Sequence, residues 1–179
     1  LAIDGTPNKA TLGANAILGC SLAFARAMSV QNSEPLYRTF SKIVARPAQR
    51  LPRLTVNLLS GGKHAGGQVP IQDVLIVPFS ASVEESLRWT SEVYLCAAQV
   101  CADKYQMRLL TADEGGLAPP CTTCEEMFEL ALESIERAGL VGQVKLATDV
   151  ASSHFENEGH YQLDGKDLSG PQMIERLQR

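Results

Sequence analysis

The fold is decided by residues 54–77, which read LTVNLLSGGKHAGGQVPIQDVLIV. The apolar run over residues 54–59 predicts a buried strand that ends at Ser60. A glycine-rich loop follows, and residues 69–77 predict a second strand. Two strands in direct succession do not fit the plain strand–helix alternation of an ordinary βα barrel.

The predicted second strand carries a carboxylate among apolar side chains. Period-two alternation places Asp73 on a face that it shares with apolar residues only. The residues of this face are Val69, Ile71, Asp73, Leu75 and Val77. A carboxylate in such surroundings must be paired, protonated or turned toward a wet cavity, because an isolated charge is costly in an apolar environment. Asp73 is therefore a candidate functional residue.

Each of the two helices predicted after these strands begins with a capping box. Ser82 with Glu85, and Thr123 with Glu126, have the required spacing. Gly139 ends the second helix, because glycine readily adopts the left-handed conformation found after helix ends. The first helix has apolar positions at Val83, Leu87, Tyr94, Ala97 and Cys101.

The remaining elements complete an α/β order. A third strand is predicted over residues 144–150, then a polar hairpin-like stretch over residues 156–166 and a last helix from Pro171. After residue 51 the order is therefore strand, strand, helix, helix, strand, helix. This order predicts an α/β fold.

The character of the chain changes near residues 47–52, where two prolines interrupt it. Before them, residues 12–28 predict a helix rich in alanine and other small residues, and residues 35–44 predict a shorter helix. The first helix is apolar on most faces, so we expect it to pack between other elements. We divide the chain into a helical part, residues 1–50, and a second domain, residues 51–179.

Composition excludes several classes of partner. The chain has 179 residues and a net charge of −4, from 16 basic and 20 acidic residues, and it has no basic run. We therefore expect no nucleic-acid partner. The longest apolar stretch, residues 14–28, is interrupted by polar residues and is shorter than the ~20 residues that span a bilayer. We expect no membrane partner either.

The cysteines indicate a reducing compartment. An odd number of scattered thiols is typical of a cytoplasmic protein rather than of a disulfide framework. They lie at positions 20, 96, 101, 121 and 124. The Cys121-Thr-Thr-Cys124 spacing suits a zinc or redox site, but no second such pair or pair of histidines accompanies it. Position 1 is Leu, so we expect an excised or incomplete start.

Acids and an imidazole follow apolar, strand-like runs. The three signatures are Gly61-Gly62-Lys63-His64, Asp113-Glu114-Gly115-Gly116 and Thr148-Asp149. Such groups at strand exits allow a barrel-type enzyme to converge its chemistry on one point. Each signature also has a structural explanation. His64 could be a solvated loop residue, Asp113 and Glu114 could form a polar turn, and Asp149 could cap a helix or act only through another residue. His154 and His160 lack this context, and we interpret them as surface residues.

These signatures, with three further segments, resemble consecutive motifs of the enolase family, in the same order and at similar spacing. The segments are Leu12-Gly13-Ala14-Asn15-Ala16-Ile17-Leu18-Gly19, the loop 61–67, Ile71-Gln72-Asp73, residues 113–119, residues 149–153 and Leu168-Ser169-Gly170-Pro171-Gln172. The resemblance covers essentially the whole chain. It implies a partial TIM-like barrel with the strand-strand-helix-helix opening, preceded by helices from the end of an α+β N-terminal domain.

The resemblance implies a magnesium-dependent carbon–oxygen lyase of glycolysis, which reversibly dehydrates 2-phosphoglycerate to phosphoenolpyruvate. Such a reaction requires cations that stabilise an enolate and an acid that assists the departing hydroxide. Asp149 matches the first Mg²⁺-binding carboxylate of the family, and Glu114 matches the acid beside the departing hydroxyl. Asp73 stands where the family has a glutamate that works beside that acid. His64 matches a loop histidine near the substrate's phosphate and hydroxyl.

Some of the family's chemistry is absent from these residues. The other two metal carboxylates, the base lysine and a second lysine belong to later barrel strands of the family. We therefore expect an internal piece of a longer enolase that is inactive alone. The chain also departs from the family at Asp73, which is one methylene short, at Ala112 in place of glycine, and at Thr148 in place of an apolar residue.

Two alternatives to a working enolase stay open. One is a non-catalytic enolase-like scaffold or interaction protein that has lost catalytic residues. The other is a different member of the superfamily that acts on sugar acids, although such relatives usually lack a motif like Asp113-Glu114-Gly115-Gly116. The resemblance further implies a homodimer, with a small phosphorylated three-carbon compound as its substrate.

Overall fold

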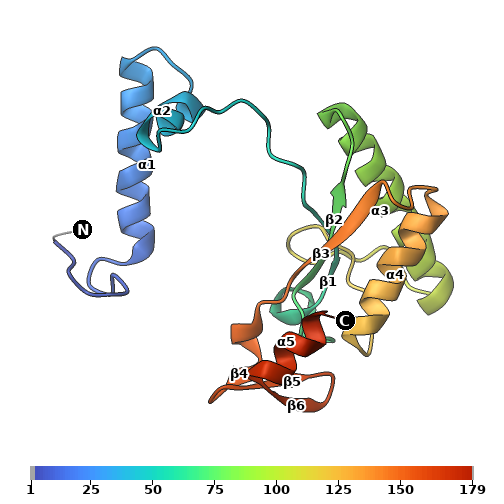
Figure 1. Cartoon of the computed structure of the whole chain (residues 1–179). Helices are drawn as coiled ribbons and strands as arrows, with labels where there is room; N and C mark the ends of the chain where they lie inside the picture. The colour runs from blue at the N-terminus through green and yellow to red at the C-terminus, as the bar shows by residue number, and fades with distance from the viewer. Residues whose placement is uncertain (1–2, 179) are drawn as a thin grey trace. The chain divides into compact units, whose positions relative to one another are not determined.

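The computed structural model describes residues 3–178, and the chain forms two compact units (Figure 1). The division falls between Pro52 and Arg53. Each unit is described by itself below.

The first unit consists of two helices, α1 (Ala14–Gln31) and α2 (Leu36–Ile43). Glu34 lies in the turn between them. It accepts a hydrogen bond from Thr39 and forms an ion pair with Lys42, and both of these residues belong to α2. We expected the first helix to pack between other elements, and within the described residues of the first unit α2 packs against it. Within this unit only Ala25 and Ser29 of α1 are buried, whereas Leu18, Leu22, Phe24 and Val30 are exposed. The apolar sequence pattern predicted the helix correctly, but the pattern does not specify what covers it.

The second unit is built on a three-stranded antiparallel sheet with the order β1-β2-β3. Its strands are β1 (Val56–Ser60), β2 (Asp73–Pro78) and β3 (Val144–Asp149). The predicted order of strands and helices is confirmed, and the sheet is open, as a partial barrel requires. Because β2 lies antiparallel between the other two strands, β1 and β3 run in the same direction.

The second strand begins later than the sequence pattern predicts, at Asp73 rather than Val69. Main-chain groups of residues 69–72 instead bond to the preceding loop: the amides of Gly61 and Gly62 donate to the carbonyl oxygens of Gln72 and Val69. The predicted period-two alternation is present in β2. The fully buried side of β2 is the one opposite Asp73, with Val74 and Ile76 at 0% exposure, whereas Leu75 and Val77 are only half-buried.

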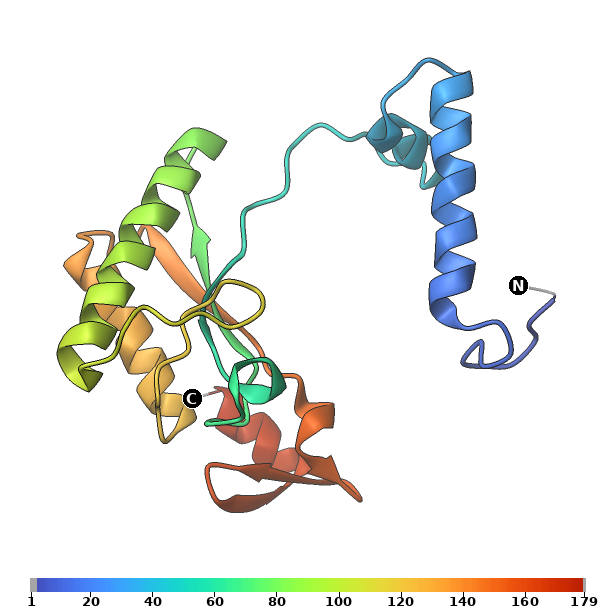
Figure 2. The ribbon, with the colours of Figure 1, turned by 180° about the vertical axis from the view of Figure 1, so that it is seen from behind.

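Two long helices, α3 (Val83–Tyr105) and α4 (Cys124–Arg137), lie side by side against the sheet (Figures 1 and 2). Both predicted caps are confirmed, because Ser82 and Thr123 each accept a hydrogen bond from the amide three residues later. The predicted apolar face of α3 is wrong at its start, where Val83 and Leu87 are exposed. The buried positions of α3 are Ser86, Trp89, Val93, Ala97, Val100 and Cys101.

The end of the chain forms a small antiparallel sheet and a helix. The hairpin-like stretch has three short strands, β4 (Glu156–Asn157), β5 (His160–Leu163) and β6 (Lys166–Ser169), and α5 (Gly170–Gln178) follows. Asp164, in the turn after β5, accepts a hydrogen bond from the amide of Cys124 at the start of α4 (3.0 Å). This bond attaches the small sheet to the helical layer. Across residues 3–178, the helices are all too short or too polar to cross a membrane.

Glu126 joins the end of α3 to the start of α4. Its carboxylate accepts hydrogen bonds from the Tyr105 hydroxyl (2.6 Å) and the Thr122 amide (2.8 Å), and it pairs with Lys104 (3.2 Å). The Tyr105 hydrogen bond is the largest cause that lowers the pKa of Glu126 to about 2. Since this value lies below the ordinary 4.5, ionised Glu126 stabilises the folded state, and the stabilisation disappears as the pH falls from 4.5 toward 2.

Replacing Glu126 with Gln is expected to lower the free energy of unfolding by about 1–3 kcal/mol at pH 7, because three partners lose an ionised acceptor. The difference from wild type should shrink at about pH 3, where the wild-type carboxylate begins to lose its charge. Urea unfolding of the purified protein at both pH values measures it. Glu129→Gln is the matched control, an exposed acid of the same helix. An equal loss at both pH values would contradict this account.

Candidate functional site

Three polar residues meet at one end of the main sheet. Ser60 is the last residue of β1, Asp73 is the first of β2, and Asp149 is the last of β3. Ser60 lies opposite Asp73 in the first ladder, and Asp73 lies opposite Asp149 in the second. Directly opposed residues of an antiparallel pair point to the same face, with Cβ atoms about 5 Å apart. The register therefore places two carboxylates next to each other on one face.

Asp73 is 4% exposed, and its carboxylate has three hydrogen-bond donors. The Oδ1 atom accepts from Asn57 Nδ2 at 2.5 Å and from Ser60 Oγ at 2.9 Å. The Oδ2 atom accepts from Gln72 Nε2 at 3.2 Å. These donors replace the water that the buried carboxylate has lost.

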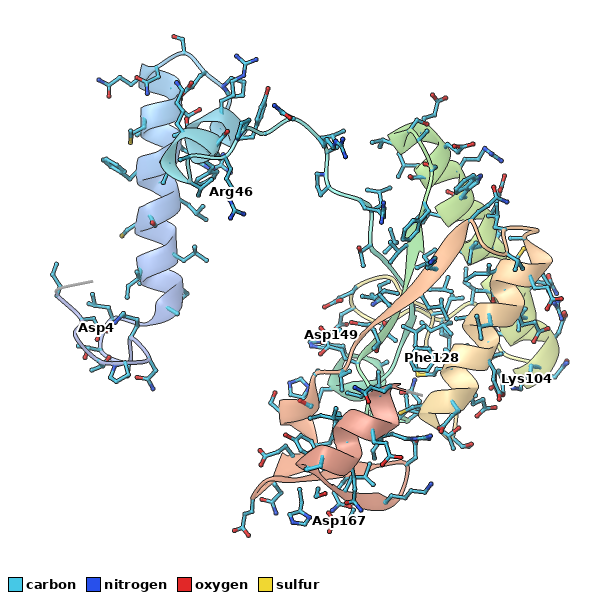
Figure 3. The ribbon with its side chains drawn as sticks, in the orientation of Figure 1. Asp4, Arg46, Lys104, Phe128, Asp149 and Asp167 are labelled. Atoms are coloured by element: carbon cyan, nitrogen blue, oxygen red, sulfur yellow. The ribbon has the colours of Figure 1, made fainter. Side chains whose placement is uncertain are left out.

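Asp149 lies at the exposed end of β3 (Figure 3). Its Oδ1 atom accepts a hydrogen bond from the amide of Ala151 (3.1 Å), which turns the chain into the short helix η2 (Ser152–His154). Its Oδ2 atom accepts no hydrogen bond within residues 3–178. One oxygen thus supports the local turn, as the structural alternative predicts, while the other is available to a ligand.

His64 sits in a loop that only glycine can form at its start. The loop contains the short helix η1 (Gly62–Ala65). A Cβ atom on Gly61 would lie 2.4 Å from the carbonyl oxygen of Ile71, so this backbone approach excludes larger residues. The His64 side chain is 44% exposed, and its Nδ1 atom is 3.8 Å from Asp113 Oδ2. This contact links the two loops that sequence analysis singled out, and it becomes an ion pair when the imidazole is protonated.

Residues 111–117 are fastened to the end of β1. Leu117 exchanges hydrogen bonds with β1: its amide donates to Leu58 O (2.9 Å), and its carbonyl accepts from the Ser60 amide (2.8 Å). The Tyr94 hydroxyl, from α3, donates to Gly115 O (2.9 Å). Glu114 lies at the tip of this loop, exposed, and its side chain makes no hydrogen bond or ion pair within residues 3–178. The loop is anchored, but its acid is free.

Sequence reasoning missed the residues that hold Asp73. Asn57, Ser60 and Gln72 appeared only as members of a strand or loop, yet each donates to the Asp73 carboxylate. A signal existed at Asn57, because an amide within an apolar strand must find partners for the same reason as a buried acid. No comparable signal marks Ser60, whose side chain reads as part of a turn.

Other chemistry-bearing residues lie outside this arrangement. Burial raises the pKa of Cys101 to about 11 and of Cys124 to about 12, and it also raises the pKa of Cys121, so the reactive thiolate is disfavoured at all three. His154 and His160 are exposed. A cavity of about 520 Å³ is lined mainly by apolar side chains of α4, β3 and α5, and none of the four candidate residues lines it.

The oxygen atoms at this end of the sheet are of the type that binds a hard divalent cation. Carboxylate oxygens are the ligands that Mg²⁺ prefers, and Asp149 offers a free oxygen beside Asp73. Within residues 3–178 there is no cluster of three or more acids, histidines or cysteines that could hold a metal ion. The site as described therefore supplies part of an octahedral shell.

Gly116→Ala is expected to destabilise the protein by about 1–3 kcal/mol. An added Cβ atom would lie 2.5 Å from Ser60 Oγ and 2.6 Å from Asn57 Oδ1, so these side chains must move away from Gly116 and leave their present positions around Asp73. Thermal and urea unfolding measure the loss. Gly170→Ala is the control, since a Cβ atom there meets nothing within 4 Å. Equal effects of the two substitutions would show that the close approach at Gly116 is unimportant.

The chain matches two family models. Residues 48–176 match the model "Enolase, C-terminal TIM barrel domain", and residues 1–40 match "Enolase, N-terminal domain". The chain is also similar to a curated protein named Enolase from Methanocaldococcus jannaschii, with 39% identity over 180 residues. That alignment covers 98% of this chain and 41% of the relative, so the chain spans less than half of the relative's length. With a barrel-domain match over most of its residues, the chain belongs to the enolase family.

Proposed function

We propose that the complete protein containing these residues catalyses the reversible dehydration of 2-phosphoglycerate to phosphoenolpyruvate. Membership in the enolase family supports this reaction. The observation that carries it for this chain is the register of the sheet. That register sets Asp73 beside Asp149 at the end where the loops of His64 and Glu114 also attach. These are the groups that a dehydration needs near one point.

The proposed roles follow from the environment of each side chain. Glu114 assists the departing hydroxyl, because its carboxyl is exposed, free of other partners and carried by an anchored loop. His64 contacts the substrate near its phosphate and hydroxyl. Asp73 contacts the substrate beside Glu114, from a position fixed by three hydrogen bonds.

Family membership implies a metal cofactor in general, and we propose that it is Mg²⁺ held by Asp149. When bound, the cation supplies positive charge that stabilises the enolate formed on proton removal. In this proposal the Oδ2 atom of Asp149 binds the cation, while its Oδ1 atom continues to accept the hydrogen bond from the Ala151 amide. The relative extends well beyond the matched region. We propose that later barrel strands supply the other ligands and the base lysine, so that residues 1–179 alone are inactive.

The biological setting is proposed on the same basis. A family enzyme with reduced thiols and this reaction acts in the cytoplasm, in glycolysis and gluconeogenesis, as a homodimer. The competing proposal is a non-catalytic scaffold. The specific observation in its favour is Asp73 itself, because the resemblance to the family implies a glutamate at that position.

Glu114→Gln is expected to lower turnover at least about 100-fold, because an amide cannot donate the proton that the departing hydroxide requires. Phosphoenolpyruvate formation by the complete protein, with and without Mg²⁺, measures it. Glu129→Gln again serves as the control, as an exposed acid on α4. A folded wild-type protein without turnover would instead favour the scaffold, and a fully active Glu114→Gln variant would remove Glu114 from the acid role.

Asp149→Asn is expected to raise the Mg²⁺ concentration for half-maximal activity at least about tenfold, because it removes a ligating charge. The amide oxygen can still accept from Ala151, so the turn after β3 should persist. Activity titrated against Mg²⁺, with thermal unfolding beside it, separates the two effects. An unchanged Mg²⁺ requirement would show that Asp149 only stabilises the turn after β3 and does not bind the cation.

A further inference from the structure

We propose that Asn57 and Ser60 are positioning residues: their side chains connect Asp73 to the backbone at Gly116 and so fix the distance between Asp73 and Glu114. We call these two side chains the polar bridge. The proposal rests on the proposed function, and it adds two residues that act through others rather than on the substrate.

The bridge is locked on the side of Asp73. Asn57 Nδ2 donates both to Asp73 Oδ1 (2.5 Å) and to Ser60 Oγ (2.9 Å), and Ser60 Oγ donates to the same Asp73 oxygen (2.9 Å). Each member of this triangle is thus held by the other two. The buried Oδ1 atom of Asn57 accepts no hydrogen bond within the described residues. Its amide therefore keeps this orientation through donation to Asp73, because reversing it would set the oxygen against the carboxylate.

The bridge is closed on the opposite side by Gly116. A Cβ atom on Gly116 would lie 2.5 Å from Ser60 Oγ and 2.6 Å from Asn57 Oδ1. The Gly116 backbone therefore lies against both side chains, with no room for a Cβ atom between them. Glu114 is only two residues away, in a loop whose Gly115 carbonyl is held by Tyr94. A movement of the bridge is thereby transmitted to the segment that carries Glu114.

Asp73 cannot retreat from the bridge. Its backbone pairs with Ser60 on one side and Asp149 on the other, and its carbonyl accepts from Thr148 Oγ1 (2.8 Å). A glutamate at position 73 would advance its carboxylate by about 1 Å, roughly one bond's reach. The extra methylene would press Asn57 and Ser60 against Gly116. The site is therefore fitted to an aspartate.

The first test uses Ser60→Ala in the complete protein, which removes the hydroxyl without adding bulk. Dehydration involves two events, removal of the substrate's C2 proton and departure of hydroxide, and Glu114 serves only the second. We expect kcat to fall at least about tenfold, while exchange of the C2 proton with solvent deuterium stays within about twofold of wild type. Ser91→Ala, an exposed serine of α3, is the matched control.

If Ser60→Ala lowered kcat and the rate of C2 proton exchange equally, or lowered neither, the proposal would be overturned. A merely structural defect would not separate these two rates.

The second test is Asp73→Glu, for which we expect kcat to fall about tenfold. Combining it with Ser60→Ala should recover at least about threefold over Asp73→Glu alone, because the missing hydroxyl makes room. A more active Asp73→Glu variant, or strictly additive losses, would also overturn it.

A third measurement tests the bridge without turnover. The Ala112 amide donates to Gly116 O (2.8 Å), so its hydrogen exchange reports movement of Gly116. We expect its exchange to rise at least about fivefold in Ser60→Ala and to stay unchanged in Ser91→Ala. Wild-type protein without turnover would contradict the proposed function, whereas unchanged Ala112 exchange would overturn the bridge even in an active enzyme.

Discussion

The rest of the site depends on the register of β2 between β1 and β3. Because the three strands are antiparallel neighbours, the first residue of β2 lies level with the last residues of both partners, Ser60 and Asp149. A slip of one residue would turn Asp73 to the opposite face and put Gln72 or Val74 in its place. The fully buried Val74 and Ile76 oppose such a slip, since they would lose their place in the core. Packing on one side of β2 therefore fixes the chemistry on the other.

Stability and function use separate sets of polar contacts. Glu126 ties α3 to α4, and Asp164 ties the small sheet to α4. Asp73 instead accepts hydrogen bonds from Asn57 and Ser60 at the end of the sheet, and these bonds orient its carboxylate beside two loops. A buried acid is costly unless its partners are in place. The donors around Asp73 therefore indicate a position whose geometry is maintained against that cost.

Much of this arrangement was predictable from the sequence. The order of elements, both capped helices and the strand ends before His64 and at Asp149 follow from turn chemistry and periodicity. The strand predicted before Glu114 is wrong, because residues 106–112 form a loop with an isolated bridge at Thr111. The start of β2 could not be predicted, because residues 69–72 have strand-like side chains but bond to a loop. The exposed start of α3 depends on tertiary neighbours, which periodicity does not reveal. The contact of Gly116 with Ser60 joins residues far apart in the sequence, and no local pattern records it.

The central claim is that these groups converge on one ligand. The most direct measurement is a crystal structure of the complete protein grown with Mg²⁺ and 2-phosphoglycerate. The account predicts a cation bonded to Asp149 at about 2.1 Å. It also predicts the substrate's hydroxyl beside Glu114 and Asp73, with its phosphate reached by the loop of His64. A cation or substrate bound elsewhere, with Asp149 and Glu114 left in solvent, would contradict it.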